Sequence, residues 1–537
     1  MKNIALIINS LQGGGAERCA ADLSIYFSQK GYCVYLITEV SMGIKYEYGG
    51  TLVNYIFSLK SAGGAQESDT LKRKVDELRE IKEKYHVDIA ISFMQTANYL
   101  NILSKENEKI ILTTHSLNSE YAKLDKSLPW SEQTFKELYQ YADMITFPSD
   151  WCRNDWIKHY GDENGITRTV YNPVHYMNVS QNTYKENIVI SIGRMHGVKR
   201  QWHLIRAFKL VKEECPNSKL VILGEGGLRA ALTSLIERLG LQDDIEMPGN
   251  VRNVQDYLAL AKVYVTTSRC EAMPCSVLEA MSAGVPVVAC DIPGGIREEL
   301  GIEGSLEKKT YPIMADCGII TPYIKDEQSD GFSYEEKCLA KEIVKLLENE
   351  QLRQAMGHRA VKRAEEFIIE KVGATWIYDI FHTCLNREID QEKFDKVREK
   401  NFMEFHSQNA ANERLNEAYY KLLEKWMVLR ERGKNIRKFF KDRKYHNIII
   451  YGLGKMANHL IYDLNVSDIN IVCAIDKAAI NKYGNFPIVT NDAEIPSADC
   501  IIITPVYEFE EIRNELRIKT DVPIISLNEV IDFVNDL

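Results

Sequence analysis

Residues 267–290 read TSRCEAMPCSVLEAMSAGVPVVAC, which indicates a strand end, a loop, a short helix stopped by Gly284 and a second buried strand. Glu271 lies in the loop, and Glu279 follows eight residues later on the helix. Carboxylates suit the recognition of sugar hydroxyls, because each oxygen accepts charge-assisted hydrogen bonds. The free N–H groups and the positive dipole end at the helix start suit a phosphate. The stretch therefore predicts one short element that holds a sugar, a ribose and a diphosphate together.

The composition is that of an ordinary globular protein. A chain of 537 residues is too long for one hydrophobic core, so about two to four domains are expected. The net charge of −10 argues against nucleic acid as a partner. Apolar runs such as Ile448–Tyr451 are too short to cross a membrane, and residues 1–8 lack the pattern of a signal peptide. The twelve cysteines are scattered without a CxxC pair, so we expect reduced thiols and a cytoplasmic protein.

Short buried strands alternate with helices along residues 1–387, which predicts α/β domains with parallel sheets. A turn-prone stretch at 171–175 divides this region into domains 1–172 and 173–387. In the first domain we expect a helix at Ala16–Gln29 and strands at Ile4–Ile8, Val34–Thr38, Ile89–Phe93 and Ile110–Thr113. In the second we expect strands at Asn187–Ile192, Lys219–Leu223, Asp244–Met247, Val263–Thr267, Val285–Ala289 and Gly318–Ile320.

The character of the chain changes after residue 387. Residues 388–445 are polar and helix-prone, which predicts a helical linker. Residues 446–537 return to the α/β pattern and predict a third, small Rossmann-like domain. Its expected strands are Ile448–Tyr451, Ile471–Ile475, Cys500–Thr504 and Pro523–Ser526.

Two cations, Arg194 and Lys199, lie in a loop after the first strand of the second domain. Doubly wound sheets bind ligands at this end of their strands. Such a pair can clamp a diphosphate and neutralise the charge that builds on a departing nucleotide. The alternative is two solvated surface cations, which is the usual state of Lys and Arg. The acidic pair downstream in the same domain favours the clamp.

Two further strand ends of the second domain carry turn residues. Gly224 and Glu225 end one strand, where glycine lets the backbone approach a ligand, and a tight strand-to-helix turn is the equal alternative. Asn250 and Val251 follow the next strand and can edge a nucleotide base.

In the first domain, Gly13-Gly14-Gly15 opens the first helix and can present N–H donors to an anion. The loop lacks the Lys-Ser/Thr of a P-loop, so hydrolysis of a nucleoside triphosphate is not expected, and a plain turn is the alternative. His115 follows the strand Ile110–Thr113, where a functional and a structural histidine are competing interpretations.

The motifs and their spacing resemble the retaining GT4 family of glycosyltransferases over roughly residues 1–385. The resemblance is carried by Gly14-Gly15-Ala16-Glu17-Arg18, Gly193-Arg194 with Lys199, Gly224-Glu225-Gly226, and Glu271…Glu279 followed by Gly284-Val285-Pro286. It implies the GT-B fold, in which two Rossmann-like domains face each other and the donor binds on the side of the second. Residues 374–378 resemble the final helix that crosses back to the first domain.

The resemblance also implies roles for individual residues. Arg194 and Lys199 match the pair that binds the donor diphosphate, and Glu271 matches the acid that contacts the sugar hydroxyls. Glu279 matches the acid that binds the ribose, and His115 a position near the reacting sugar. The remaining donor-binding positions are Gly14, Gly15, Gly224, Glu225, Asn250, Val251, Ala272, Met273, Pro274 and Leu278. Ala272 stands where the family usually has glycine, which leaves the shape of the sugar pocket open.

The implied reaction is a retaining transfer from a nucleotide sugar, with UDP expected, to a glycan or lipid-linked acceptor in surface polysaccharide synthesis. Residues 1–385 contain no D-x-D motif, and cationic side chains can do the work of a metal, so we expect no divalent metal and no further cofactor. Two alternatives stay open. One is a sugar-nucleotide epimerase of the same architecture, and the other is a non-catalytic scaffold whose C-terminal domain recruits partners.

Residues 451–457 of the third domain read YGLGKMA and fit the dinucleotide pattern G-x-G-x-x-A. Gly452, Gly454 and Ala457, with Asp476 at the end of the next strand, predict a second nucleotide site. A relic of the fold that mediates assembly is the alternative.

Residues 421–444 hold ten Lys or Arg against three acidic residues, with Trp426, Phe439 and Phe440 among them. One interpretation is a solvated connecting helix. The other is an electrostatic contact with anionic lipid at the inner face of the membrane, worth about 1 kcal/mol per cation near the surface. The aromatic residues favour the membrane.

Overall fold

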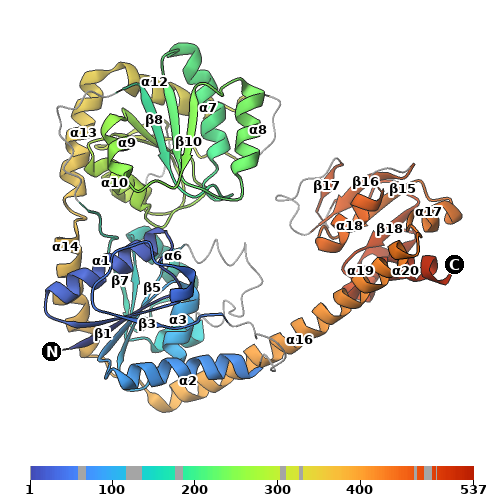
Figure 1. Ribbon diagram of the computed structural model, residues 1–537, viewed down its shortest axis with the longest axis horizontal. Helices are drawn as coiled ribbons and strands as arrows, with labels where there is room; N and C mark the ends of the chain where they lie inside the picture. Colours follow the sequence, from blue (N-terminus) through green and yellow to red (C-terminus); the bar gives the residue numbers. More distant parts are fainter. Residues whose placement is uncertain are drawn as a thin grey trace. The chain divides into compact units, whose positions relative to one another are not determined.

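The computed structural model describes residues 2–58, 68–116, 136–175, 186–302, 310–325, 331–464, 468–476, 486–490 and 493–537, with backbone alone at 68–69, 406–417, 455 and 507. The chain forms two compact units, residues 1–405 and 406–537. The first unit contains two seven-stranded sheets, and the second contains one five-stranded sheet (Figure 1).

The first sheet has the strand order β3-β2-β1-β4-β5-β6-β7, and every pairing in it is parallel. Its central strands are almost entirely apolar and buried, as expected where helices cover both faces. The strands are β1 (Asn3–Ile8), β2 (Cys33–Thr38), β3 (Thr51–Asn54), β4 (Ile89–Phe93), β5 (Lys109–Thr113), β6 (Met144–Phe147) and β7 (Thr167–Thr169). The helices are α1 (Gly15–Gln29), η1 (Val40–Met42), α2 (Ser68–Lys84), α3 (Gln95–Leu103), η2 (Tyr139–Tyr141) and α6 (Asp150–Tyr160).

The second sheet has the order β10-β9-β8-β11-β12-β14-β13, and only its edge strand β13 is antiparallel. The strands are β8 (Ile188–Ile192), β9 (Lys219–Leu223), β10 (Ile245–Gly249), β11 (Val263–Thr266), β12 (Val287–Cys290), β13 (Ile313–Met314) and β14 (Gly318–Thr321). The helices are α7 (Gln201–Glu214), α8 (Arg229–Leu239), α9 (Val254–Leu260), α10 (Cys275–Ser282), α11 (Ile296–Glu299), α12 (Tyr334–Glu348) and α13 (Glu350–Ala364). The predicted pair of parallel-sheet domains is therefore confirmed.

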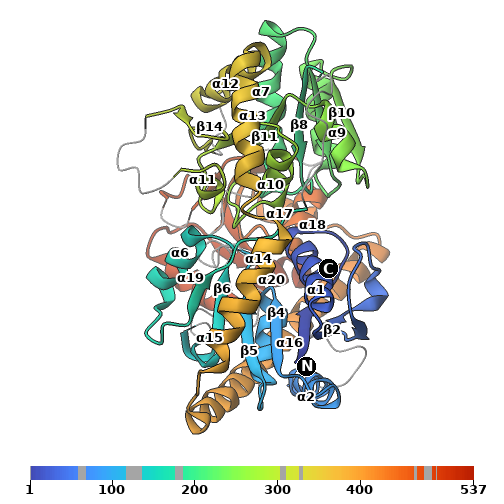
Figure 2. The ribbon, with the colours of Figure 1, turned by 90° about the vertical axis from the view of Figure 1, so that its left-hand side faces the viewer.

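The end of the second domain returns to the first, as the resemblance implies for residues 374–378. The returning segment comprises α14 (Ile369–Thr375), the π-helical turn η3 (Trp376–Ile380) and α15 (Phe381–Leu385) (Figure 2). Trp376 and Phe381 pack against Phe27 of α1, with ring centroids 6.5 and 5.2 Å away. This segment therefore completes the core of the first domain.

A single long helix, α16 (Gln391–Glu431), joins the two units. Phe394 and Phe405 near its start are buried in the core of the first domain. Trp426 and Leu429 near its end are buried in the core of the second unit. The segment predicted as a linker thus supplies apolar side chains to two separate cores.

The second unit contains a parallel sheet with the order β17-β16-β15-β18-β19. Its strands are β15 (Asn447–Tyr451), β16 (Asn470–Ile475), β17 (Ile488–Val489), β18 (Cys500–Ile503) and β19 (Ile524–Ser526). Its helices, apart from the end of α16, are α17 (Arg437–Arg443), α18 (Lys455–Leu464), η5 (Val506–Glu508), α19 (Phe509–Arg517) and α20 (Leu527–Asp536). The third α/β domain expected from the sequence is confirmed.

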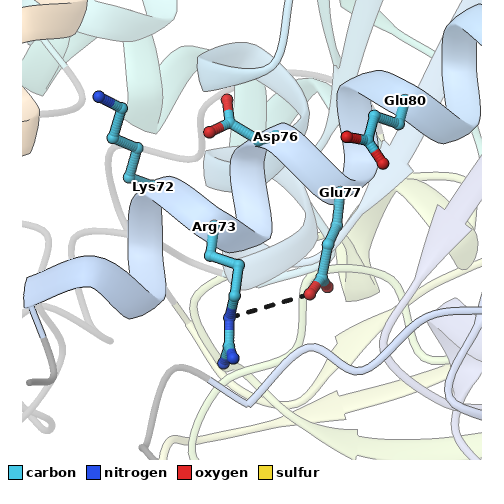
Figure 3. A pocket seen from close by; sticks show the side chains of 5 residues that line it. All are labelled: Lys72, Arg73, Asp76, Glu77 and Glu80. Atoms are coloured by element: carbon cyan, nitrogen blue, oxygen red, sulfur yellow. Dashed lines mark ion pairs between the residues drawn. The ribbon is translucent and has the colours of Figure 1, made fainter. Parts of the chain in front are cut away.

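Two general features of the described ranges bear on function. No helix in them is both long and apolar enough to cross a bilayer. A surface hollow of about 280 Å³ lies along α2 and is lined only by charged side chains of that helix, among them Arg73 and Glu77 (Figure 3). No residue predicted to bind the donor lines this hollow.

Candidate active site

Glu271 and Lys199, which the sequence places 72 residues apart, form an ion pair in the second domain. Lys199 Nζ lies 2.6 Å from Glu271 Oε1, and the Ser268 hydroxyl donates to the same oxygen, also at 2.6 Å. The Glu271 side chain is 14% exposed. Its carboxylate is therefore fixed by a cation and a hydroxyl from two loops at the carboxyl ends of β8 and β11.

The backbone of Glu271 is held as firmly as its side chain. Its N–H donates to Pro293 O at 3.1 Å, and its carbonyl accepts from the Gly295 N–H at 3.2 Å. Gly294, between them, has φ +122°, and a Cβ there would lie 1.6 Å from Glu271 O. Only glycine allows this close approach of two chain segments.

The loop from Ala272 to Pro274 leads into α10 with its carbonyls already satisfied. Ala272 O accepts from Ser149 Oγ at 3.0 Å, and Met273 O accepts from Asn172 Nδ2 at 3.1 Å. The N-cap of α10 is Pro274, and no side chain caps the helix. The first N–H groups of α10 therefore remain available to an anion, and the macrodipole favours negative charge there.

The glycine-rich turn of the first domain meets the second domain at this helix. Arg194 is exposed, and its Nη2 donates to Gly13 O at 3.2 Å. A Cβ on Gly15 would lie 3.1 Å from Cys275 Sγ. Gly14 donates its N–H to the Tyr46 hydroxyl at 3.2 Å. The turn thus lies against both the Arg194 loop and the start of α10.

Glu279 of α10 is almost completely buried and forms an ion pair with a residue of the first domain. Arg18 Nη1 of α1 lies 2.6 Å from Glu279 Oε1. Burial raises the pKa of Glu279, and the Arg18 charge opposes that rise. Leu278, its neighbour, is fully buried among apolar side chains of the second domain.

The glycine loop after β9 packs closely against the loop that follows β8. A Cβ on Gly224, which has φ +131°, would lie 2.2 Å from Gly193 O. Glu225 Oε1 accepts from Arg229 at 2.6 Å, and its carbonyl accepts from the Met195 N–H at 2.9 Å. The strand-to-helix turn that competed with ligand approach in the sequence is therefore present, and it supports the loop that carries Arg194. Asn250 is exposed and Val251 half-buried after β10.

His115 lies beyond β5 and stacks on Phe93, with ring centroids 5.6 Å apart. Burial lowers its pKa to about 4, so the imidazole is neutral at pH 7. Its Nδ1 is buried without a hydrogen-bond partner among the described residues. The structure shows no contact between His115 and Glu271 or Lys199 within the described ranges.

Sequence reasoning missed three groups near these residues. Ser268 and Arg18 lie within recognised motifs, but the sequence did not indicate that they bind Glu271 and Glu279. Glu299 of α11 is fully buried, and neither carboxylate oxygen has a hydrogen-bond partner among the described residues. Burial, followed by the charge of Glu271, raises the pKa of Glu299 well above its ordinary value. No sequence signal distinguishes this acid from an exposed one.

The fingerprint of the third domain lies after β15, as predicted. Gly452 has φ +82°, and Asp476 at the end of β16 accepts from the Leu453 N–H at 2.6 Å. Ala457 is fully buried on α18, and a Cβ on Gly454 would meet nothing within 4 Å. Asp476 thus supports the glycine loop, and nucleotide binding by the third domain stays a prediction.

The aromatic residues of the basic stretch do not face a membrane. Trp426, Phe439 and Phe440 are each at most 3% exposed and form part of the core of the second unit. The expectation that they favour a membrane contact is wrong, because amphipathic helices bury this side of the stretch against the sheet. The cations Lys438 and Lys441 remain on the exposed side.

Comparison with known families assigns most of the chain. Residues 13–176 match the family described as "Glycosyltransferase Family 4", and residues 176–304 match "Glycosyl transferases group 1". Residues 444–524 match a domain described as "C2185-like, N-terminal".

Individual relatives agree with these matches. An uncharacterized glycosyltransferase of Methanocaldococcus jannaschii is 32% identical over 334 residues, which cover 57% of this chain and 82% of the relative. A Campylobacter jejuni enzyme that is an N-acetylgalactosaminyltransferase acting on a diphospho-undecaprenol glycan is 24% identical over 381 residues, or 68% of this chain and 96% of that protein.

Solved structures share the fold of the first unit. Sucrose-phosphate synthase from Thermosynechococcus elongatus has a TM-score of 0.57 at 16% identity and covers 72% of this chain and 99% of its own. HepE of Anabaena has a TM-score of 0.55 at 17% identity, covering 71% and 100%. The two domains and these matches define a glycosyltransferase of the GT-B fold. The chain belongs to the GT4 family of glycosyltransferases.

Proposed function

We propose that this glycosyltransferase transfers a sugar from a UDP-sugar, with retention of configuration, to a glycan or lipid-linked acceptor. Relatives support the acceptor class, because two Campylobacter jejuni enzymes act on diphospho-undecaprenol-linked glycans and a Bacillus subtilis relative glucosylates poly(glycerol phosphate). The choice of UDP is supported by HepE, which has been solved with UDP and has the same fold.

The observation that carries the proposal is the Lys199–Glu271 pair beside the uncapped start of α10. Lys199, Arg194 and the first N–H groups of α10 form a positive region suited to a diphosphate. Glu271 is a carboxylate fixed next to that region and suited to sugar hydroxyls. Charges of opposite sign so close together fit a ligand that joins a sugar to a phosphate.

In the proposed step, the bond between the anomeric carbon and the phosphate oxygen breaks, and the electron pair leaves with the nucleoside diphosphate. The cations and the α10 N–H groups stabilise that negative charge as it develops. The acceptor hydroxyl attacks from the face that the leaving group departs, which retains the configuration. Its proton passes to the released phosphate oxygen. Glu271 positions the sugar here, in contrast to the two-carboxylate scheme of glycosidases.

The remaining predicted site residues take supporting roles in the proposal. Glu279 accepts from the ribose hydroxyls, and Gly15 presents its backbone N–H to the phosphates. Gly14, whose N–H donates to the Tyr46 hydroxyl, shapes the turn that faces them. Neutral His115 binds near the reacting sugar as a hydrogen-bonding group. The other walls of the donor site are Glu225, Asn250, Val251, Ala272, Met273 and Pro274. Leu278, buried in the core, and Gly224, packed on Gly193, support these walls.

A screen of nucleotides and nucleotide sugars by thermal unfolding tests the donor. UDP and one UDP-sugar should raise the unfolding temperature most, because a ligand present at 100 times its Kd stabilises by about 2.7 kcal/mol. Incubation with that UDP-sugar alone should yield no epimer, and addition of lipid-linked glycan should yield a product whose anomeric configuration is read by NMR. An inverted product, or stabilisation by purine nucleotides alone, contradicts the proposal.

Metal independence is the second part of the proposal. Within the described ranges, no three or more His, Cys, Asp or Glu side chains are placed to hold a metal ion. The basis of the proposal is that Arg194 and Lys199 can supply the positive charge that a metal ion would otherwise provide. We expect transfer at full rate after dialysis against EDTA. Loss of activity that returns with Mg²⁺ or Mn²⁺ contradicts this part.

A lipid-linked acceptor places the enzyme at a membrane surface, and we propose that the exposed cations of the second unit contribute to this placement. The aromatic side chains of the stretch are buried, so the contact is electrostatic only. Flotation with anionic vesicles should weaken in the double variant Lys438→Glu/Lys441→Glu. The matched control is Lys393→Glu/Lys396→Glu on the exposed side of α16, with no change expected. Equal flotation with neutral and anionic vesicles rules out the contact.

A further inference from the structure

The buried acid of α10 has a partner that the known motif does not explain. Glu279 is 7% exposed, and its Oε1 receives Arg18 Nη1 at 2.6 Å. Arg18 belongs to α1 in the first domain, so the pair joins the two domains of the first unit. A carboxylate this deeply buried needs a compensating charge, and Arg18 is the cation that supplies it.

Arg18 is itself held in place from the opposite side. Its Nε lies 3.9 Å from Asp22 Oδ2, one helical turn further along α1. Asp22 is 6% exposed, and its other oxygen, Oδ1, lies 2.6 Å from His175 Nε2. His175 lies where the chain passes from the first domain to the second. The guanidinium therefore lies within ion-pair distance of two buried carboxylates, one from each domain.

The pair leaves hydrogen-bond acceptor capacity on the Glu279 carboxylate. A carboxylate offers about four acceptor sites on two oxygens, and Arg18 occupies one site on Oε1. The two ribose hydroxyls of a nucleotide can use the remaining sites while the ion pair persists. Arg18 thus fixes the rotamer of Glu279 without competing for the same lone pairs.

We propose that Arg18 is a positioning residue that orients the Glu279 carboxylate for the donor ribose, so that both domains take part in recognising one sugar. The inference rests on the proposed function, in which Glu279 binds that ribose. It assigns to the first domain a share in nucleotide selection, in addition to the phosphate contact of its glycine turn. A ribonucleotide should then be distinguished from a deoxyribonucleotide only when the Arg18–Glu279 pair is intact.

Calorimetric titration of the full chain with UDP and with 2′-deoxy-UDP tests the proposal. A hydrogen bond to an ionised group accounts for about a ten- to hundredfold change in Kd. The wild type should bind UDP more tightly than 2′-deoxy-UDP by about that factor. Arg18→Ala should weaken UDP binding more than 2′-deoxy-UDP binding, because UDP loses two oriented hydroxyl contacts and the deoxynucleotide only one, so the preference for UDP should shrink. Arg18→Lys should restore part of the preference. Arg73→Ala, on the exposed face of α2, is the matched control and should behave as the wild type.

Two further results separate this inference from the proposed function. If Glu279→Gln abolishes the preference for UDP while Arg18→Ala and Arg18→Lys keep it, Glu279 binds ribose without help and the inference is wrong. If Glu279→Gln keeps the preference, or the wild type shows none, the ribose role of Glu279 fails and the proposed donor site fails with it. If Arg18→Ala does not fold, the uncharged variant Arg18→Gln decides: a glutamine variant that folds and binds both nucleotides as the wild type does overturns the inference.

Discussion

Replacement of Lys199 by alanine should remove most of the catalytic rate while leaving the fold intact. Lys199 Nζ lies 2.6 Å from Glu271 Oε1, and the lysine side chain is 27% exposed. In the proposed step this cation meets the negative charge of the departing phosphate. Loss of one such electrostatic group typically costs about 2.7–4 kcal/mol of barrier, which is about a 10²- to 10³-fold loss of rate.

The second consequence of this change concerns Glu271. Its Oε1 keeps the hydrogen bond from Ser268 at 2.6 Å, so the carboxylate is not left without a partner. The cost of unpairing it is therefore smaller than for an isolated buried charge. A double-mutant cycle of Lys199→Ala with Glu271→Gln should give a coupling of about 0.5–3 kcal/mol, because the two groups are in contact.

The assay is transfer of labelled sugar from the UDP-sugar to the acceptor, measured as kcat/KM for the donor. Lys212→Ala is the control, because Lys212 forms a 2.7 Å ion pair with Asp244 in the same domain but is not a site residue. Its kcat/KM should match the wild type. A Lys199→Ala enzyme within about twofold of the wild type would refute the clamp, since twofold corresponds to only about 0.4 kcal/mol. Additive effects in the cycle would refute the coupling to Glu271.

Three further changes test the structure that supports the site. Gly294→Ala should lower the unfolding temperature strongly, since its Cβ would lie 1.6 Å from a backbone oxygen at φ +122°, whereas Gly227→Ala, with nothing within 4 Å, should have little effect. The hydrogen bond to Asp22 raises the pKa of His175 above 6.5, so its stabilising contribution is complete below pH 6.5 and lost as pH rises through the raised pKa. His175→Asn should therefore flatten the fall in unfolding temperature as the pH rises above 6.5, and an unchanged profile contradicts the assignment. Trp426→Ala should destabilise the second unit by about 3–5 kcal/mol, seen as a lower unfolding transition that leaves sugar transfer in solution unchanged.

The strong periodic elements were predictable, and short or irregular ones were not. The strands predicted at Ile4–Ile8 and Ile89–Phe93 carry apolar runs. Both are present in the sheet, the first beginning one residue earlier at Asn3. The strand β6, Met144–Phe147, was not predicted, because four residues give too little pattern to separate a strand from a loop. The eight-residue spacing of Glu271 and Glu279 correctly indicated a loop followed by a helix, since strand end, proline and glycine stop all agree.

The partners of the charged residues were beyond the reach of the sequence. The pattern identified Lys199 and Glu271 separately, but their contact depends on how the loops after β8 and β11 fold together. The sequence predicted that Trp426 favours a membrane contact, but Trp426 is buried in the core of the second unit. Composition alone does not show which side of a helix is buried. Burial requires a neighbouring sheet, and the sequence of one segment does not contain that information.

Local physical chemistry in the sequence determined the parallel-sheet domains, the glycine turns and the two acids of the α10 motif, because each follows from residues close together in the chain. Tertiary structure decided which charges meet. Arg18 and Glu279 are separated by 261 residues and belong to different domains, yet their side chains lie 2.6 Å apart. An ion pair of this kind depends on the packing of two domains and on the exclusion of water between them. The local sequence of either segment predicts neither of these.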